Sequence, residues 1–325
     1  MKIKKEFVIL GAAIIVLSLY LIFHNTNRTN YQMPVFTEIS GKDISKIEVG
    51  KQGESIVLNK KSNNWYVSPE GYPVDSGKIK TMLDAIENLT VTAMVSESKN
   101  YDRYDLSDDK KITIKAWADN SLKRDFEVGK PASSYRHTFV KLSDDYRVYH
   151  ARKNFRNGFD QTVENLRDKT VLLFDKTKIQ KIQLTKEMQS VVFTRKQTPL
   201  EGSDTKEVAV KDREVEKTDT IWVNDNGKMC DKSVIDRLLV TLSNLSCNKY
   251  INDRKKDAFT NPVYTIELAG ELADSQKHTL SIFEKTEKYD KSYPVISSGN
   301  DYPFLLTGRL MEKIMINPDK ILKTP

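Results

Sequence analysis

The stretch NWYV (residues 64–67), followed by a polar turn and the helix-like run DSGKIKTMLDAIENL (residues 75–89), occurs twice in this chain. Its second copy is IWV (residues 221–223), a polar turn, and DKSVIDRLLVTLSNL (residues 231–245). Five apolar positions of the first run have apolar counterparts 156 residues downstream, namely Ile79, Met82, Leu83, Ile86 and Leu89. We therefore expect two tandem repeats with one architecture.

Each helix-like run starts with an aspartate, Asp75 or Asp231, whose carboxylate is suited to accept from the free N–H groups of a first helical turn. The apolar residues form one stripe, as expected of a helix that packs on a sheet. Short alternating runs bounded by turn residues surround each helix, for example residues 44–49, 112–117 and 263–268. The predicted fold class is α+β, each repeat being a mostly antiparallel sheet with one packed helix.

These patterns divide the chain into five parts. We predict a cytoplasmic leader and transmembrane anchor at 1–24, a tether at 25–43, repeat 1 with a helical connector at 44–170, repeat 2 at 171–317, and a tail at 318–325. Repeat 2 carries an insertion of about 22 residues around Pro199 to Thr220, with charges of both signs. A solvated loop is the simpler interpretation of the insertion, and a functional contact is the alternative.

The N-terminus resembles a membrane anchor. Residues 7–23 carry no charge and amount to about 25 Å of helix at ~1.5 Å per residue. Three lysines precede the segment, which favours an N-terminus inside the cell and residues after about 25 outside the cytoplasm. A cleaved signal peptide is the rival interpretation, but no small residues mark a cleavage site near Phe23. A helix buried in the protein core is the third interpretation of residues 7–23.

The composition argues against nucleic acid as a partner. Charged residues make up 30% of the 325 residues, with 52 Lys and Arg against 45 Asp and Glu, for a net charge of +7. Acidic and basic residues alternate nearly everywhere, whereas a nucleic-acid binder usually gathers its basic residues on one face.

Candidate catalytic and metal-binding residues are scarce. Cys230 and Cys247 flank the second helix about 25 Å apart, too far for a disulfide across a straight helix. His137 and His150 lie on the two arms of one predicted hairpin, on one face or on opposite faces depending on the loop length. Neither arrangement supplies a full zinc ligand set.

Sequence motifs of common active sites are also missing. The chain has no G-x-S-x-G, Walker A or G-x-G-x-x-G motif, and Gly129-Lys130 lacks the glycine and hydroxyl residue of a phosphate loop. We assign no catalytic, cofactor-binding or metal-binding residues and expect a protein that is not an enzyme. An envelope enzyme would need a polar cluster that only the folded chain assembles.

The order of the short motifs resembles the bacterial domain-of-unknown-function family 4340 (DUF4340). These motifs are NWYV (64–67), PVD (73–75), FEVGK (126–130), VY (148–149), LRD (166–168) and LLFD (172–175). The chain departs from the family at Tyr104-Asp105-Leu106, where the family tends to have aromatic-Gly-Leu. The resemblance implies a duplicated layout, an N-terminal anchor in the bacterial inner membrane, and genes beside ABC-transporter components, including gliding-motility auxiliary proteins.

Together these observations favour a single-pass, extracytoplasmic accessory or scaffold protein. Its partners are expected in the membrane or envelope, with ABC-transporter-like subunits implied by the resemblance. The alternative is a binding module for envelope glycan, lipid or peptide, which would use the cleft between the repeats.

Overall fold

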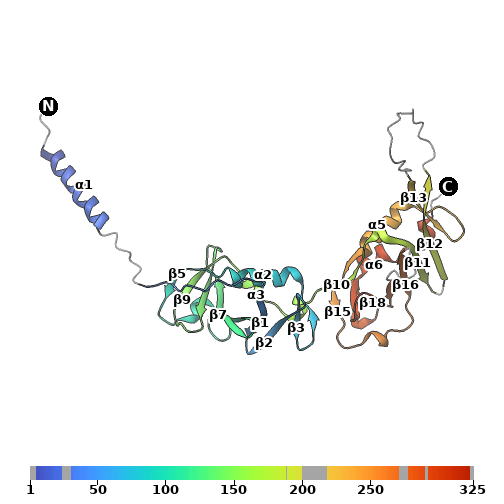
Figure 1. Cartoon of the computed structure of the whole chain (residues 1–325), viewed down its shortest axis with the longest axis horizontal. Helices are drawn as coiled ribbons and strands as arrows, with labels where there is room; N and C mark the ends of the chain where they lie inside the picture. Colours follow the sequence, from blue (N-terminus) through green and yellow to red (C-terminus); the bar gives the residue numbers. More distant parts are fainter. Residues whose placement is uncertain are drawn as a thin grey trace. The chain divides into compact units, whose positions relative to one another are not determined.

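The protein is described by a computed structural model over residues 5–23, 31–187, 189–199, 218–270, 277–289 and 292–322 (Figure 1). The chain divides into two compact units, Met1–Leu166 and Arg167–Pro325. Each unit has its own hydrophobic core, so each is considered by itself.

The first unit is built on a nine-stranded sheet in which every paired strand is antiparallel, in the order β4-β3-β2-β1-β6-β7-β8-β9-β5. Its strands are β1 (Ile44–Lys51), β2 (Glu54–Lys61), β3 (Asn64–Ser68), β4 (Tyr72–Pro73), β5 (Val91–Ser96), β6 (Ile112–Ala118), β7 (Ser121–Pro131), β8 (His137–Leu142) and β9 (Val148–Arg152). Its helices are α2 (Ser76–Glu87), η1 (Tyr101–Tyr104), α3 (Arg156–Phe159) and α4 (Val163–Leu166). Helix α2 buries Ile79, Met82 and Ile86 in the core.

The second unit contains an eight-stranded antiparallel sheet in the order β13-β12-β11-β16-β17-β18-β19-β15, and a small sheet of β10 and β14. Its strands are β10 (Thr170–Leu173), β11 (Ile179–Lys186), β12 (Gln189–Pro199), β13 (Thr218–Asn224), β14 (Asn244–Ser246), β15 (Lys249–Tyr250), β16 (Tyr264–Gly270), β17 (His278–Ile282), β18 (Ser292–Ser297) and β19 (Phe304–Thr307). Its helices are η2 (Lys176–Lys178), α5 (Lys232–Ser243), η3 (Lys256–Ala258), η4 (Glu287–Tyr289), α6 (Gly308–Ile314) and η5 (Pro318–Ile321).

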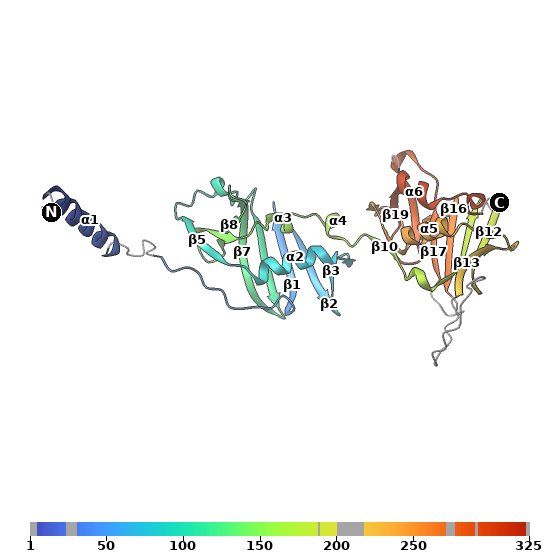
Figure 2. The same ribbon diagram turned by 90° about the horizontal axis from the view of Figure 1, so that it is seen from above.

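The two large sheets have the same strand order once the two-residue β4 is set aside. They also share an irregularity: the register of β1 on β6 shifts between Ile44 and Lys46, and that of β11 on β16 shifts between Ile179 and Lys181. In both units one long helix follows an edge strand of the large sheet, α2 after β4 and α5 after β13 (Figures 1 and 2). The prediction of mostly antiparallel sheets with few helices is confirmed.

The predicted helix caps are confirmed at Asp75 and Asp231. The Asp75 carboxylate accepts from the backbone N–H of Lys78 at 2.9 Å, and the Asp231 carboxylate accepts from that of Ser233 at 2.9 Å. The backbone N–H of each aspartate donates to a carbonyl from the far end of its unit, Leu166 at 2.8 Å and Ile321 at 2.7 Å. Both accepting carbonyls belong to fully buried residues, so the last residues of each described unit belong to its core.

Two predicted boundary segments have structure of their own. In the region predicted as a tail, η5 contains the buried Ile321, and Leu322 forms a bridge with Cys230. The predicted insertion is outside the described residues from 200 to 217, and β12 and β13 form its two sides.

The N-terminal segment forms helix α1 (Lys5–Phe23), whose side chains are described from Ile9 to Tyr20. In the part of the chain that is described, no helix combines the length and apolar character needed to cross a membrane.

The residues predicted as a tether include a segment that packs on the first unit, which we call the strap (residues 31–39). Met33, Phe36 and Ile39 contact the core of this unit. The Tyr31 hydroxyl accepts from the backbone N–H of Met94, in the outermost strand β5, at 3.0 Å. Figure 2 shows this stretch running along the first unit before β1.

The Asp75 cap yields a stability prediction. Asp75→Ala should destabilise α2 by about 1 kcal/mol, because the first turn loses its side-chain acceptor. Hydrogen exchange of the amides in residues 76–87 should show the loss. The matched control is Asp84→Ala on the exposed middle of the same helix, where a change within about 0.5 kcal/mol is expected. Equal effects of the two substitutions would contradict the capping role.

Candidate functional site

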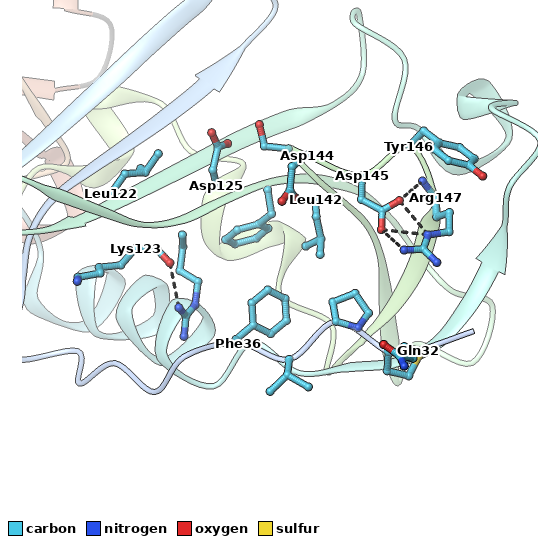
Figure 3. A pocket seen from close by; sticks show the side chains of 16 residues that line it. Gln32, Phe36, Leu122, Lys123, Asp125, Leu142, Asp144, Asp145, Tyr146 and Arg147 are labelled. Carbon is cyan, nitrogen blue, oxygen red and sulfur yellow. Dashed lines mark hydrogen bonds and ion pairs between the residues drawn. The ribbon is translucent and has the colours of Figure 1, made fainter. Parts of the chain in front are cut away.

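A pocket of about 940 Å³ lies between the strap and two turns of the first sheet (Figure 3). Its walls are strap residues 32–36, residues 122–126 at the start of β7, and residues 142–147 between β8 and β9. Figure 3 shows Gln32 and Phe36 facing Leu142 and Asp145 across the opening. We call it the strap pocket. Its volume is in the range of small-molecule sites.

Arg124 is a nearly buried cation in the wall of this pocket. Its side chain is 5% exposed, and its two terminal nitrogens donate to the carbonyls of Lys123 at 2.9 Å and Thr37 at 2.7 Å. The guanidinium carbon lies 5.3 Å from the centre of the Phe36 ring. Burial lowers the pKa of the guanidinium, but an arginine stays charged in proteins. The contact with Thr37 fixes the strap on the sheet.

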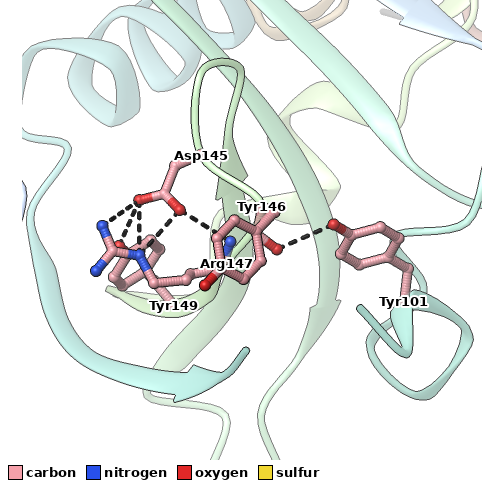
Figure 4. A network of polar contacts seen from close by, with 5 residues as sticks. All are labelled: Tyr101, Asp145, Tyr146, Arg147 and Tyr149. Atoms are coloured by element: carbon pink, nitrogen blue, oxygen red, sulfur yellow. Dashed lines mark hydrogen bonds and ion pairs between the residues drawn. The ribbon is translucent and has the colours of Figure 1, made fainter. Parts of the chain in front are cut away.

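On the opposite wall, Asp145 is the centre of a polar network (Figure 4). Arg147 donates to both carboxylate oxygens, at 2.9 Å and 2.7 Å, and the Tyr149 hydroxyl donates at 2.6 Å. The Arg147 guanidinium holds the pKa of Asp145 well below its usual range. Burial, followed by the bond to Asp145, raises the pKa of the Tyr149 hydroxyl. The network stiffens the turn between β8 and β9.

A second carboxylate in this unit is also held by cations. Glu127 lies 2.9 Å from Lys111 and 3.0 Å from Lys141, and only 13% of its side chain is exposed. Lys111 lies 2.7 Å from Asp108 as well. These charges stabilise one another beside β7 and β8.

His137 and His150 lie on one face of the sheet as diagonal neighbours, since Phe139 is the residue directly paired with His150. Their rings stack with centroids 5.3 Å apart, and Phe139 lies 4.8 Å from His150. Burial, with a contribution from His137, lowers the pKa of His150. Over the described ranges no three His, Cys, Asp or Glu residues gather in a way that would hold a metal ion.

The Gly129-Lys130 pair lies within β7 and serves close packing. A Cβ at residue 129 would lie 2.2 Å from the carbonyl oxygen of Tyr104. Asp105, the departure from the family pattern, has φ of 53°, a left-handed conformation that favours glycine. Both features belong to the same crossing of η1 over β7. The two cysteines are buried, as small hydrophobic residues would be.

Sequence reasoning missed Arg124 and the role of the strap. Arg124 stands among charged neighbours in the run KRD (residues 123–125), and nothing local marks it as buried. The alternate positions of Asp145, Arg147 and Tyr149, which lead into β9, are a usable signal, because residues two apart in extended chain share a face.

Comparison with known proteins identifies a family. The model of the family described as "Domain of unknown function (DUF4340)" matches residues 65–262, which include most of the first sheet and the long helix of the second unit. No curated protein and no solved structure matches the chain.

The close packing at residue 129 leads to a prediction. Gly129→Ala should destabilise the first unit by about 2 kcal/mol or more, because the added methyl group meets backbone that cannot yield easily. Gly50→Ala, also within a strand of this sheet, is the control: its Cβ would lie 3.6 Å from the nearest atom, an ordinary contact. Urea unfolding compares the two, and equal stabilities would rule out the steric role.

The Asp145 network predicts a pH dependence. Because the folded-state pKa of Asp145 lies below the unfolded value of about 3.9, its contribution is present above that value and is lost as the pH falls further. Asp145→Asn should therefore cost about 2 kcal/mol at pH 7 and clearly less at pH 3. Urea unfolding at both pH values tests this. Its exposed neighbour supplies the control, since Asp144→Asn should change the stability at pH 7 by no more than about 0.5 kcal/mol.

Proposed function

The chain belongs to the DUF4340 family, and from that premise we propose that it is a membrane-anchored, extracytoplasmic accessory protein that binds partners and does not transform a substrate. The family description assigns no activity, so the proposal depends on the residues themselves.

The observation that carries the proposal is the structural use of the most strongly interacting carboxylates. Asp145 is bound by Arg147 and Tyr149, Glu127 by two lysines, and Asp75 by the first turn of α2. A catalytic acid or base needs a proton that it exchanges near the working pH. Groups fixed in this way stiffen a scaffold, which suits a binding protein.

Membrane attachment is supported by the N-terminal sequence. Residues 7–23 carry no charge, three lysines precede them, and the large apolar side chains of α1 from Ile9 to Tyr20 are exposed. In the proposed arrangement the N-terminus is cytoplasmic and the two units lie outside the inner membrane.

We also interpret the two units as an internal duplication. Three independent features support this. The strand order is shared, and so is the register shift near Ile44 and Ile179. In each unit the N–H of the cap aspartate also donates to a carbonyl near the end of that unit. A duplicated scaffold presents two related surfaces, which is useful to an accessory subunit that contacts more than one protein.

The proposed partners are subunits of an ABC-transporter-like complex, as the family resemblance implies. The outer strand β13 is a candidate contact, because a strand at the edge of a sheet offers unpaired backbone groups. Residues 200–217, which precede β13 in the sequence, are the second candidate.

Crosslinking in intact cells, followed by detergent extraction and a pull-down through a C-terminal tag, tests the proposal. Transporter subunits should be recovered with the full-length chain. The control replaces residues 7–23 by an unrelated membrane-spanning helix, and the same partners should remain if the two units make the contacts. A pull-down without partners at native expression would overturn the accessory role.

A further inference from the structure

Arg124 carries a charge that the described protein does not neutralise. Burying a guanidinium costs several kcal/mol unless an anion compensates it. Among the described residues no carboxylate lies within ion-pair distance of Arg124, and its contacts with Lys123 and Thr37 are to neutral carbonyls. Its Nε–H is buried and has no hydrogen-bond partner there. This donor and the positive charge are therefore left for a ligand.

The carboxylates around the strap pocket are mostly committed to other cations. Asp145 is held by Arg147 and Tyr149, and Asp125 lies 3.9 Å from Lys115. The lining carries three cationic residues, Lys123, Arg124 and Arg147, and three acidic ones, Asp125, Asp144 and Asp145. The pocket as a whole is thus near neutral, and Arg124 is its buried positive centre.

Three of the side chains that line the same pocket are large, mostly apolar and exposed to solvent. Val35 is 94% exposed, Leu122 48% and Tyr146 47%. Exposed apolar side chains beside a cavity are a common feature of binding surfaces. The pocket therefore combines a buried cation with exposed apolar side chains on its rim.

We propose that the strap pocket binds an anionic amphiphile, whose phosphate or carboxylate group pairs with Arg124 and whose apolar body lies against Val35 and Leu122. A guanidinium N–H donates a charge-assisted hydrogen bond to a carboxylate or a phosphate oxygen, and the free Nε–H of Arg124 is the donor available for it. Entry displaces Phe36, whose ring lies beside the guanidinium. Both a membrane lipid and a free amphiphile have this chemistry, and the membrane source rests on the proposed N-terminal anchor. The assignment does not depend on the proposed partners.

Binding can be measured by isothermal titration of the full-length chain in phosphatidylcholine nanodiscs, with empty nanodiscs as the blank. The probes are hexyl phosphate, hexanol and inorganic phosphate. Hexyl phosphate should bind at least about tenfold more tightly than either of the others, because it alone engages both the cation and the apolar rim. Equal binding of hexanol would overturn the proposal.

Substitution of the arginine supplies the second test. Arg124→Gln should weaken hexyl phosphate binding at least about tenfold. The control is Arg156→Gln: Arg156 also donates to two backbone carbonyls, those of Val128 and Lys110, but does not line the pocket. The Arg156→Gln variant should bind hexyl phosphate as tightly as the wild type does. Unchanged binding by Arg124→Gln would overturn the assignment.

Two further arms keep the test decisive. If Arg124→Gln fails to fold, hexyltrimethylammonium replaces hexyl phosphate with the wild-type chain, and binding of this cation with equal affinity would overturn the proposal. Nanodiscs that contain anionic phosphatidylglycerol distinguish the source of the ligand. Weaker binding of hexyl phosphate in them would support a lipid headgroup, and unchanged binding would support a free amphiphile.

Discussion

Each unit depends on a hydrogen bond that joins the start of its long helix to the end of its own chain segment. The N–H of Asp75 donates to Leu166, and the N–H of Asp231 donates to Ile321. Leu166 and Ile321 are both fully buried, so the bond places an apolar side chain where the helix meets the sheet. The sheet, the helix and the terminal segment thus share one core. The carboxylate of the same aspartate accepts from a backbone N–H in the first turn of the helix.

Within the first unit, the strap adds residues that precede the first strand to the same core. Its apolar side chains pack on the core, and Arg124 and Met94 bond to it from opposite parts of the sheet. The cost of the strap is a buried arginine that makes no ion pair with a carboxylate of the described residues. A buried charged side chain in a protein is normally paired with a group of opposite charge. The unpaired cation is the feature of this unit that packing does not explain.

Sequence patterns predicted local structure well and long-range contacts poorly. The duplicated stretch located both long helices and their caps, because periodicity and capping involve residues a few positions apart. The His137 and His150 pair was left open, because a change of one residue in the loop moves a side chain to the other face. The sequence predicts a tether where the strap lies, because Met33, Phe36 and Ile39 are isolated apolar residues in a polar run. Arg124 could not be found, since its burial depends on Thr37 and Phe36, far away in the sequence.

The hydroxyl of Tyr31 has a second consequence through its contact with Met94. An outer strand with free N–H groups is a template on which another chain can add a strand. The strap occupies one such group, the N–H of Met94 on β5, and so makes this edge less available for pairing with another strand. Lifting the strap would open the pocket and expose this edge in a single movement. One short segment of chain therefore both forms a wall of the pocket and covers part of the sheet edge.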